Sequence, residues 1–375
     1  MKKQLLIPDT LNRNNFDLFR FLLASAVIFC HCYATFYTWD DFTANEPFMV
    51  WSGGKISIGS AAVNFFFIIS GFLILRSFEY SASFWSYLKK RILRIYPGFI
   101  VAFLLSIFVF GALGHVEHTW LKTYEAYIKY VPLRMEAVNM LTLQAPIDAY
   151  YFNHMAQVGL NTSMWTIQYE FVCYLFVPVL VWLGTLKHRC ILLIAFLISY
   201  TLLLLQNYGF IFPYDGSWYG NALANPYYHP RFFTYFLAGC LVYLYKQLIP
   251  RNTLLMVLLL LLFVLALKLQ IFDLVWPIAG SYLLFFFAYH PNVLFSNFAK
   301  YGDFSYGIYL YGWPLQQLTL LYLSEYLNVF TFFLLVMPLV LLAAFISWYL
   351  IEKPALKLKN HTFRNTKVIP AINPR

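Results

Sequence analysis

Charged residues are scarce in this chain of 375 residues, in which Asp, Glu, Lys and Arg together account for 11%. A soluble domain carries about 25%. Hydrophobic residues make up 61% of the chain and aromatic residues 21%. Leaving so much apolar surface in water would cost far more than the usual folding stability of about 5–15 kcal/mol. The composition excludes an ordinary cytoplasmic globule, a disordered chain and a nucleic-acid-binding protein, and predicts a protein of the lipid bilayer.

Cysteine is also rare, and the five cysteines show no paired spacing. Their odd number and their position in apolar runs argue against a disulfide framework and against a zinc site, so we predict no metal. The chain also lacks a GxSxG nucleophile elbow, a phosphate-binding P-loop and a dinucleotide-binding glycine fingerprint. Residues that carry chemistry are therefore sought among the charges of the apolar segments.

Ten apolar stretches are long enough to be membrane-spanning helices, since a bilayer core of ~30 Å needs about 20 residues per helix. The backbone polar groups of a chain in lipid have to be satisfied within helices or a closed barrel. We therefore predict an all-α integral membrane protein, a bundle of about ten transmembrane helices. The membrane domain is expected to cover residues 1–352, and a basic cytoplasmic tail residues 353–375. The predicted spans are 16–36, 58–77, 95–114, 163–183, 190–207, 231–248, 253–271, 274–289, 303–323 and 329–350.

The basic residues predict the orientation of this bundle. Most of the 26 lysines and arginines fall in segments on the same side of the predicted spans as the N-terminus, and the net charge is +10. By the positive-inside rule, this bias places both termini in the cytoplasm. We expect a multi-pass protein of a cell membrane, either a bacterial inner membrane or a plasma membrane.

The first predicted span carries three ionisable residues, Asp17, Arg20 and His31, although each charge inside a bilayer costs ~2.5–3.5 kcal/mol. Arg20 and His31 are 11 residues apart, which is about three turns, so both lie on one face, ~16 Å apart along the axis. Asp17, one turn before Arg20, is positioned to pair with it. Two interpretations are open. Either Arg20 attracts the anionic head of a long thin ligand such as coenzyme A and His31 is a general base, or Arg20 reaches the interface and His31 is a hydrogen-bonded core residue.

Polar residues are also expected in the interior of two other spans. Glu170, in the fourth, is expected near Tyr169, Tyr174 or His31. It either orients the base or an acceptor hydroxyl, or it makes a structural hydrogen bond between helices. In the second span, Ser70–Gly71 either lets two helices approach closely beside the site or serves close packing alone.

Two arginines, Arg91 and Arg94, lie one helical turn apart at the start of the third span. Arginine pairs hold phosphate through forked hydrogen bonds. Basic clusters beside a membrane also bind anionic lipid or fix the topology. The spacing alone leaves both interpretations open.

Seven short motifs follow one another along the chain. They are Phe16–Arg20 followed after ten residues by His31, Asn64–Phe72, Arg91–Pro97, Trp165 and Thr166 with Glu170, Phe236–Gly239, Ser305–Leu310 and Ile351–Pro354. Each is similar to a motif of the membrane acyltransferase-3 family, and their order is that of the family. The chain therefore resembles this family over almost its whole length.

The resemblance implies an integral protein that moves an acyl group, most often acetyl, from cytoplasmic acyl-CoA to a hydroxyl of a cell-surface glycan or lipid-linked sugar. The expected enzyme is thus an O-acetyltransferase, with acyl-CoA as a co-substrate rather than a permanent cofactor. His31 is implied to be the catalytic base and Glu170 an active-site carboxylate. The implied acyl-CoA contacts are Arg20, Arg91 and Arg94. Further candidates for the substrate site or its support are Asp17, Ser70, Tyr169, Ser305 and Tyr309.

One position departs from the family pattern. After the motif Ser305–Leu310 the family usually has a histidine before the next proline, and Gly312 occupies that position here, ahead of Pro314. Any role of that histidine side chain is absent in this protein or supplied by another residue.

A transporter or flippase of lipid-linked saccharides is the competing interpretation, because such a protein also uses buried Arg, His and Glu. Transporters of this size often show two related halves, and this sequence shows none. Release of free CoA on addition of an acceptor separates the two classes.

Overall fold

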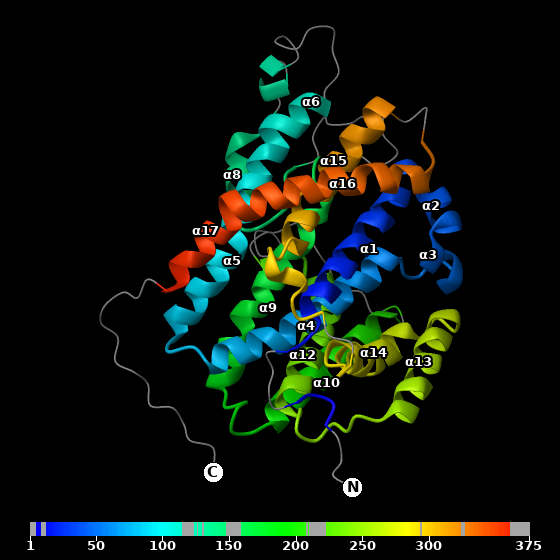
Figure 1. The fold of residues 1–375 in the computed structure, drawn as a ribbon, viewed down its shortest axis with the longest axis vertical. Helices are drawn as coiled ribbons and strands as arrows, with labels where there is room; N and C mark the ends of the chain where they lie inside the picture. The colour runs from blue at the N-terminus through cyan, green and yellow to red at the C-terminus, as the bar shows by residue number, and fades with distance from the viewer. Residues whose placement is uncertain are drawn as a thin grey trace.

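The computed structural model describes residues 5–8, 13–114, 124–125, 127–129, 131–147, 159–207, 209, 223–292, 295–323 and 327–360. Within these ranges the regular elements are all helices (Figure 1), and strand pairing is limited to an isolated bridge between Leu5 and Pro250. The predicted all-α class is confirmed. Of the predicted tail, residues 353–360 continue the last long helix, and residues 361–375 lie outside the described ranges.

The long helices are α1 (Phe16–Phe36), α4 (Ile58–Glu79), α5 (Phe84–Leu105), α9 (Trp165–Trp182), α10 (Cys190–Asn207), α12 (His229–Leu244), α13 (Thr253–Lys268), α14 (Phe272–Ala288), α15 (Ser305–Leu323) and α16 (Val329–Ser347). The shorter elements are α2 (Trp39–Asn45), α3 (Pro47–Ser52), the π-helical turn η1 (Ser106–Gly111), α6 (Ala112–Gly114), α8 (Leu133–Leu141), η2 (Thr162–Met164), η3 (Pro226–Tyr228), η4 (Phe298–Lys300), the π-helical turn η6 (Trp348–Glu352), α17 (Lys353–Lys357) and η7 (Leu358–Asn360).

Each of the ten predicted spans overlaps one of the long helices. Six helical segments are long and apolar enough to cross a membrane, whereas α13 and α14 are apolar but shorter. The number of spans and their orientation stay predictions. The six segments are Phe16–Phe36, Ile58–Glu79, Phe84–Gly114, Thr162–Trp182, Cys190–Asn207 and Val329–Lys357.

The third predicted span begins earlier than hydropathy indicates. Its helix, α5, starts at Phe84, where the Ser83 side chain accepts a hydrogen bond from the backbone N–H of Ser86, as an N-cap does. The basic residues of 89–94, which precede the predicted span, lie inside this helix. Their charges find polar partners there. Arg91, for example, donates a hydrogen bond of 3.2 Å to Ser77.

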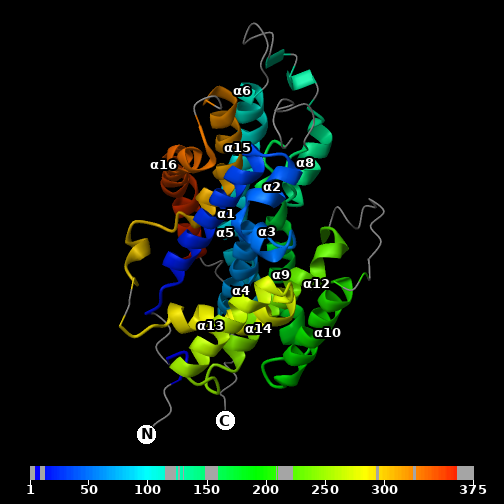
Figure 2. The ribbon, with the colours of Figure 1, turned by 90° about the vertical axis from the view of Figure 1, so that its right-hand side faces the viewer.

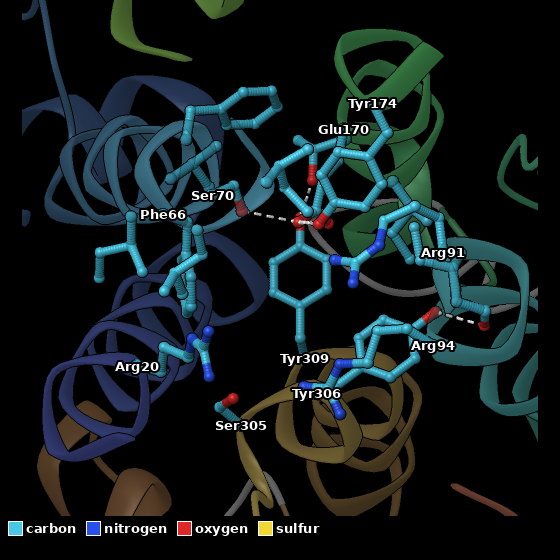
Figure 3. Close-up of a pocket in the computed structure, with 18 residues that line it drawn as sticks. Arg20, Phe66, Ser70, Arg91, Arg94, Glu170, Tyr174, Ser305, Tyr306 and Tyr309 are labelled. Carbon is cyan, nitrogen blue, oxygen red and sulfur yellow. Dashed lines mark hydrogen bonds between the residues drawn. The ribbon is translucent and has the colours of Figure 1, made fainter. Parts of the chain in front are cut away.

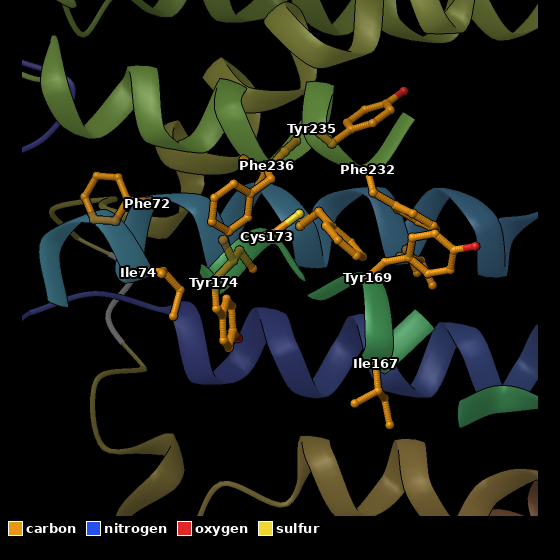
Figure 4. Close-up of a cluster of buried hydrophobic side chains, with 14 of the residues drawn as sticks. Phe72, Ile74, Ile167, Tyr169, Cys173, Tyr174, Phe232, Tyr235 and Phe236 are labelled. Carbon is orange, nitrogen blue, oxygen red and sulfur yellow. The ribbon is translucent and has the colours of Figure 1, made fainter. Parts of the chain in front are cut away.

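Helix α4 forms the centre of the bundle and packs against α1 on one side and α12 on the other. A Cβ atom at Gly71 would stand 1.9 Å from the carbonyl oxygen of Phe236, and one at Gly239 would stand 1.9 Å from that of Ile68. The two glycines therefore let the α4 and α12 backbones touch, which is how helices associate in lipid. Phe72 and Phe236 fill the space next to this crossing (Figure 4).

The remaining long helices form two groups around α1 and α4 (Figure 2). Helices α10, α12, α13 and α14 pack together as one group, and α15 and α16 pack against each other and against α1 in the other. Helix α9 contacts both α4 and α12, and α5 contacts α4 and α15. Five helices, α1, α4, α5, α9 and α15, are thus brought together around one space.

Candidate active site

A cavity lies between α1, α4, α5, α9 and α15, and it contains about 890 Å³ of unfilled space, its mouth included (Figure 3). Its apolar wall comes mainly from α4. Seven of the ten site residues predicted from the sequence line this cavity, and three, Asp17, His31 and Tyr169, do not. The polar lining residues are Arg20, Ser70, Arg91, Arg94, Thr166, Glu170, Tyr174, Ser305, Tyr306 and Tyr309.

The carboxylate of Glu170 is fixed by two hydroxyl groups. Ser70, on α4, donates a hydrogen bond of 2.9 Å from its Oγ to Glu170 Oε1. Tyr174, one turn beyond Glu170 on α9, donates from its hydroxyl to the same oxygen. Both bonds lie at the cavity wall (Figure 3). Because Oε1 accepts both, the orientation of the carboxylate is set before any ligand binds.

A second pair of hydroxyls joins α9 to α15. The Thr166 and Tyr309 hydroxyls form a hydrogen bond in which either can be the donor. Ser305 lies one turn before Tyr309 on α15, and Trp313 lies one turn after it. The lining residues on α15 extend from Ser305 to Tyr309 and stop there.

Asp303, just before α15, joins two of the predicted arginines. Its Oδ2 atom lies 2.5 Å from Arg94 Nη2 and 3.4 Å from Arg20 Nη1. Its Oδ1 atom accepts a hydrogen bond of 2.5 Å from the Ser305 hydroxyl. The adjacent positive charges of Arg94 and Arg20 favour the ionised form of the Asp303 carboxyl.

Two further carboxylates complete this ion-pair network. Asp17 Oδ1 lies 3.2 Å from Arg20 Nη1, which confirms the pairing predicted for these two residues. Glu352 Oε2 lies 3.7 Å from Arg94 Nη1, and its Oε1 accepts a hydrogen bond from Ser347. Arg20 and Arg94 are thus held by three carboxylates.

Arg91 has different surroundings. Its Nη2 atom donates to the Ser77 hydroxyl, and its guanidinium lies 5.8 Å from the ring centre of Tyr87 and 5.7 Å from that of Tyr174. Its Nε atom is buried and has no hydrogen-bond partner in the described part of the chain. Tyr174 therefore connects Arg91, near its ring, to Glu170, at its hydroxyl.

His31 lies beyond the lined part of the cavity. Its ring meets that of Trp313 edge-on, with 5.0 Å between centroids, and its buried Nδ1 atom has no hydrogen-bond partner among the residues described. Arg20 lies near Asp303 at the start of α15, whereas His31 lies near Trp313 farther along it. Helices α1 and α15 therefore run in the same direction, with His31 about one turn past the Tyr309 level. The role of His31 stays a prediction.

Gly312 brings α1 and α15 close together at this level. A Cβ atom at Gly312 would lie 2.0 Å from Cδ1 of Ile28, on α1. Gln316, one turn farther on α15, donates a hydrogen bond of 2.8 Å to the Ile28 carbonyl. The departure from the family pattern is thus a close helix contact, and Ile28 occupies the space next to it.

Tyr169 lies in an aromatic cluster on the other side of α9. Its hydroxyl bonds to the backbone of Asn225, accepting from the N–H and donating to the carbonyl. The centre of its ring lies 4.8 Å from that of Phe232, and Figure 4 shows the two side chains next to each other. We therefore assign Tyr169 to the packing of α9 against α12.

Sequence reasoning missed four residues of the site. Thr166 and Glu352 lie within two of the seven motifs. Their partners, Tyr309 and Arg94, are on other helices, so spacing along the sequence did not indicate these contacts. Asp303 stands alone at the end of an apolar segment, and Tyr306 follows Ser305. Within the described ranges, no group of three or more His, Cys, Asp or Glu is arranged to hold a metal ion.

Comparison with known proteins gives a family match and two partial relatives. The sequence profile described as "Acyltransferase domain" matches residues 13–350. The chain is 34% identical over 169 residues to "O-acetyl transferase" of Shigella phage Sf6, covering 45% of this chain and 46% of the relative. It is 29% identical over 177 residues to "Nodulation protein 10" of Rhizobium leguminosarum bv. viciae, covering 45% and 44%. The chain thus spans less than half the length of either relative, and no solved structure matches.

Proposed function

Because the chain belongs to the acyltransferase family whose profile covers residues 13–350, we propose that it is a membrane O-acyltransferase. In this proposal it moves an acyl group, namely acetyl, from cytoplasmic acyl-CoA to a hydroxyl of a cell-surface glycan or lipid-linked sugar. The name of the phage relative supports acetyl as the group transferred.

The cavity is the observation that carries the proposal. It combines arginines with a fixed carboxylate and several hydroxyls inside an apolar helical bundle. Charged groups at such depth are costly unless they serve a function or are paired. An anionic donor with an apolar arm fits this combination of arginines and an apolar wall.

The donor lies with its phosphates at the Arg91 end of the cavity and its pantetheine arm along the apolar wall of α4. The arm passes Ser70 and Glu170 and ends near Tyr309. His31 lies past Tyr309, on the side of Trp313. The hydrogen-bonded hydroxyls of Thr166 and Tyr309 line the cavity at this end, and in the proposal the thioester passes them to reach His31.

The transfer is a single displacement at the thioester carbon. His31 removes the proton of the acceptor hydroxyl as its oxygen attacks that carbon, so a C–O bond forms and the C–S bond breaks. The CoA sulfur leaves as a thiolate and takes up the proton that His31 received. Glu170 accepts a hydrogen bond from a second hydroxyl of the acceptor sugar, and Ser70 and Tyr174 keep its carboxylate in place. Holding both reactants in a site that excludes water supplies much of the acceleration.

Acceptor-dependent release of CoA thiol tests the proposal in membranes that contain the protein. We expect thiol release together with acetylation of the acceptor, seen as a mass increment of the surface glycan or lipid-linked sugar. His31→Ala should lower the rate about 100-fold or more, whereas His188→Ala, at an exposed position between α9 and α10, should not change it. A transporter would change the location of the saccharide without releasing thiol, and that result would overturn the proposal.

A further inference from the structure

The cations near the cavity mouth fall into two sets with different partners. Arg20 and Arg94 contact three carboxylates, those of Asp17, Asp303 and Glu352. The positive charge of these two arginines is therefore already balanced by carboxylates of the protein.

Arg91 belongs to the other set. It lines the cavity, yet it pairs with no carboxylate in the described ranges, and its buried Nε atom has no hydrogen-bond partner there. A guanidinium with an unused N–H group at a cavity wall is suited to bind an anion.

Two lysines lie close to Arg91. Lys90 donates a hydrogen bond of 3.1 Å to the Ser81 hydroxyl, next to the contact of Arg91 with Ser77. From the other end of the chain, α17 and η7 pack against α5 (Figure 1) and bring Lys359 to the same place. Partial burial lowers the pKa of Lys359, and the nearby charges of Arg94, Arg91 and Lys90 lower it further.

Within the described ranges, none of the three cations of this second set forms an ion pair with a carboxylate. The sequence that follows, residues 361–375, contains no Asp or Glu. Three like charges held together repel one another, and a bound polyanion would relieve that repulsion.

We propose that Arg91, Lys90 and Lys359 bind the nucleotide phosphates of the acyl-CoA donor, while Arg20 and Arg94 hold the helices at the cavity mouth. The inference rests on the proposed function and adds two lysines that no motif indicates. It also gives the arginines different roles. Arg91, which pairs with no described carboxylate, is the phosphate ligand, whereas Arg20 and Arg94 are structural. A lipid headgroup offers the same phosphate chemistry, so the test has to separate the two sources.

The test uses purified protein in nanodiscs of neutral lipid and three acetyl thioesters, those of CoA, 3′-dephospho-CoA and pantetheine. Lys90→Gln, Lys359→Gln and Arg91→Gln should each raise the KM for acetyl-CoA about tenfold at unchanged kcat, the effect of one lost charge-assisted contact. They should leave acetyl-pantetheine, which has no phosphate, unchanged. The matched control is Lys353→Gln, because Lys353 lies in the same segment but stands over the Tyr349 ring.

Equilibrium binding of CoA to the same variants gives a readout that does not need acyl transfer. We expect weaker CoA binding in the three variants and unchanged binding in Lys353→Gln. An equal loss with acetyl-pantetheine, or full CoA affinity in all three variants, would overturn the inference. So would CoA binding that anionic lipid in the nanodisc abolishes, because the site would then belong to lipid headgroups. If wild-type protein binds CoA through these residues but transfers no acyl group, the proposed function fails and the phosphate site stands.

Discussion

Arg94 and Asp303 are 209 residues apart in the sequence, and their Nη2 and Oδ2 atoms lie 2.5 Å apart in the structure. The same carboxylate oxygen contacts Arg20 at 3.4 Å, and Ser305 holds the other oxygen. Asp303 therefore ties α1, α5 and the start of α15 together at one end of the cavity.

Asp303→Asn should destabilise the protein by about 3 kcal/mol, because it leaves two largely buried arginines without their shared carboxylate. The Ser305 hydroxyl keeps an oxygen to bond to in this variant, so the loss reports on charge. Thermal unfolding in detergent, followed by tryptophan fluorescence, measures the change. Asp40→Asn serves as the control, since Asp40 is exposed at the start of α2. Equal unfolding temperatures for Asp303→Asn and wild type would show that the network does not stabilise the fold.

Ser70→Ala should lower kcat about tenfold and leave the KM for acetyl-CoA unchanged, because it removes one of two hydrogen bonds that orient Glu170. Tyr174→Phe should act in the same way, and the double variant should lose more than either alone. Initial rates of thiol release give both constants. Ser25→Ala is the control, since that hydroxyl bonds to its own helix at Phe21. A rise in KM without a change in kcat would place Ser70 in donor binding instead.

Gly71→Ala should prevent α4 and α12 from packing, because the added methyl group would meet the Phe236 carbonyl oxygen at 1.9 Å. Two backbones cannot yield as a side chain does, so we expect a loss of about 3 kcal/mol or more. Gly98→Ala is the matched control, since its nearest contact is the Tyr306 ring at 3.0 Å. The yield of monodisperse protein and its unfolding temperature measure both variants. A Gly71→Ala protein as stable as Gly98→Ala would mean that the helices are not in backbone contact.

Local relationships within the site could be predicted from the sequence, and distant ones could not. Asp17 and Arg20 lie one turn apart, so their pairing follows from helix geometry. The contact of Glu170 with Tyr174 follows in the same way, but its contact with Ser70 crosses 100 residues. Hydropathy located the ten long helices.

The boundaries of those helices were less predictable. The start of α5 depends on polar partners in another helix, as the bond from Arg91 to Ser77 shows. The position of His31 relative to the cavity likewise depends on how α1 packs against α15. No rule of spacing within one helix gives that arrangement.

Gly312→His should destabilise this chain, although histidine is the usual residue of the family at that position. Its Cβ would lie 2.0 Å from the end of the Ile28 side chain, and overpacking of this kind costs about 1–3 kcal/mol. Shortening the neighbour in the double variant Gly312→His, Ile28→Ala should recover part of the loss. A double-variant cycle of unfolding temperatures measures this coupling. Additive effects would show that Ile28 is not what excludes a side chain at position 312.

The central claim is that the cavity between α1, α4, α5, α9 and α15 binds the acyl-CoA donor. Ser70→Cys on a Cys190→Ser background places one reactive thiol in its wall, because the other four cysteines are buried. The most direct measurement is the labelling rate of that thiol by a methanethiosulfonate reagent, with and without a thioether analogue of acetyl-CoA. We predict strong protection at saturating analogue and no protection of the exposed Cys190 in the wild-type protein. Equal labelling rates of Ser70→Cys with and without the analogue would contradict the account.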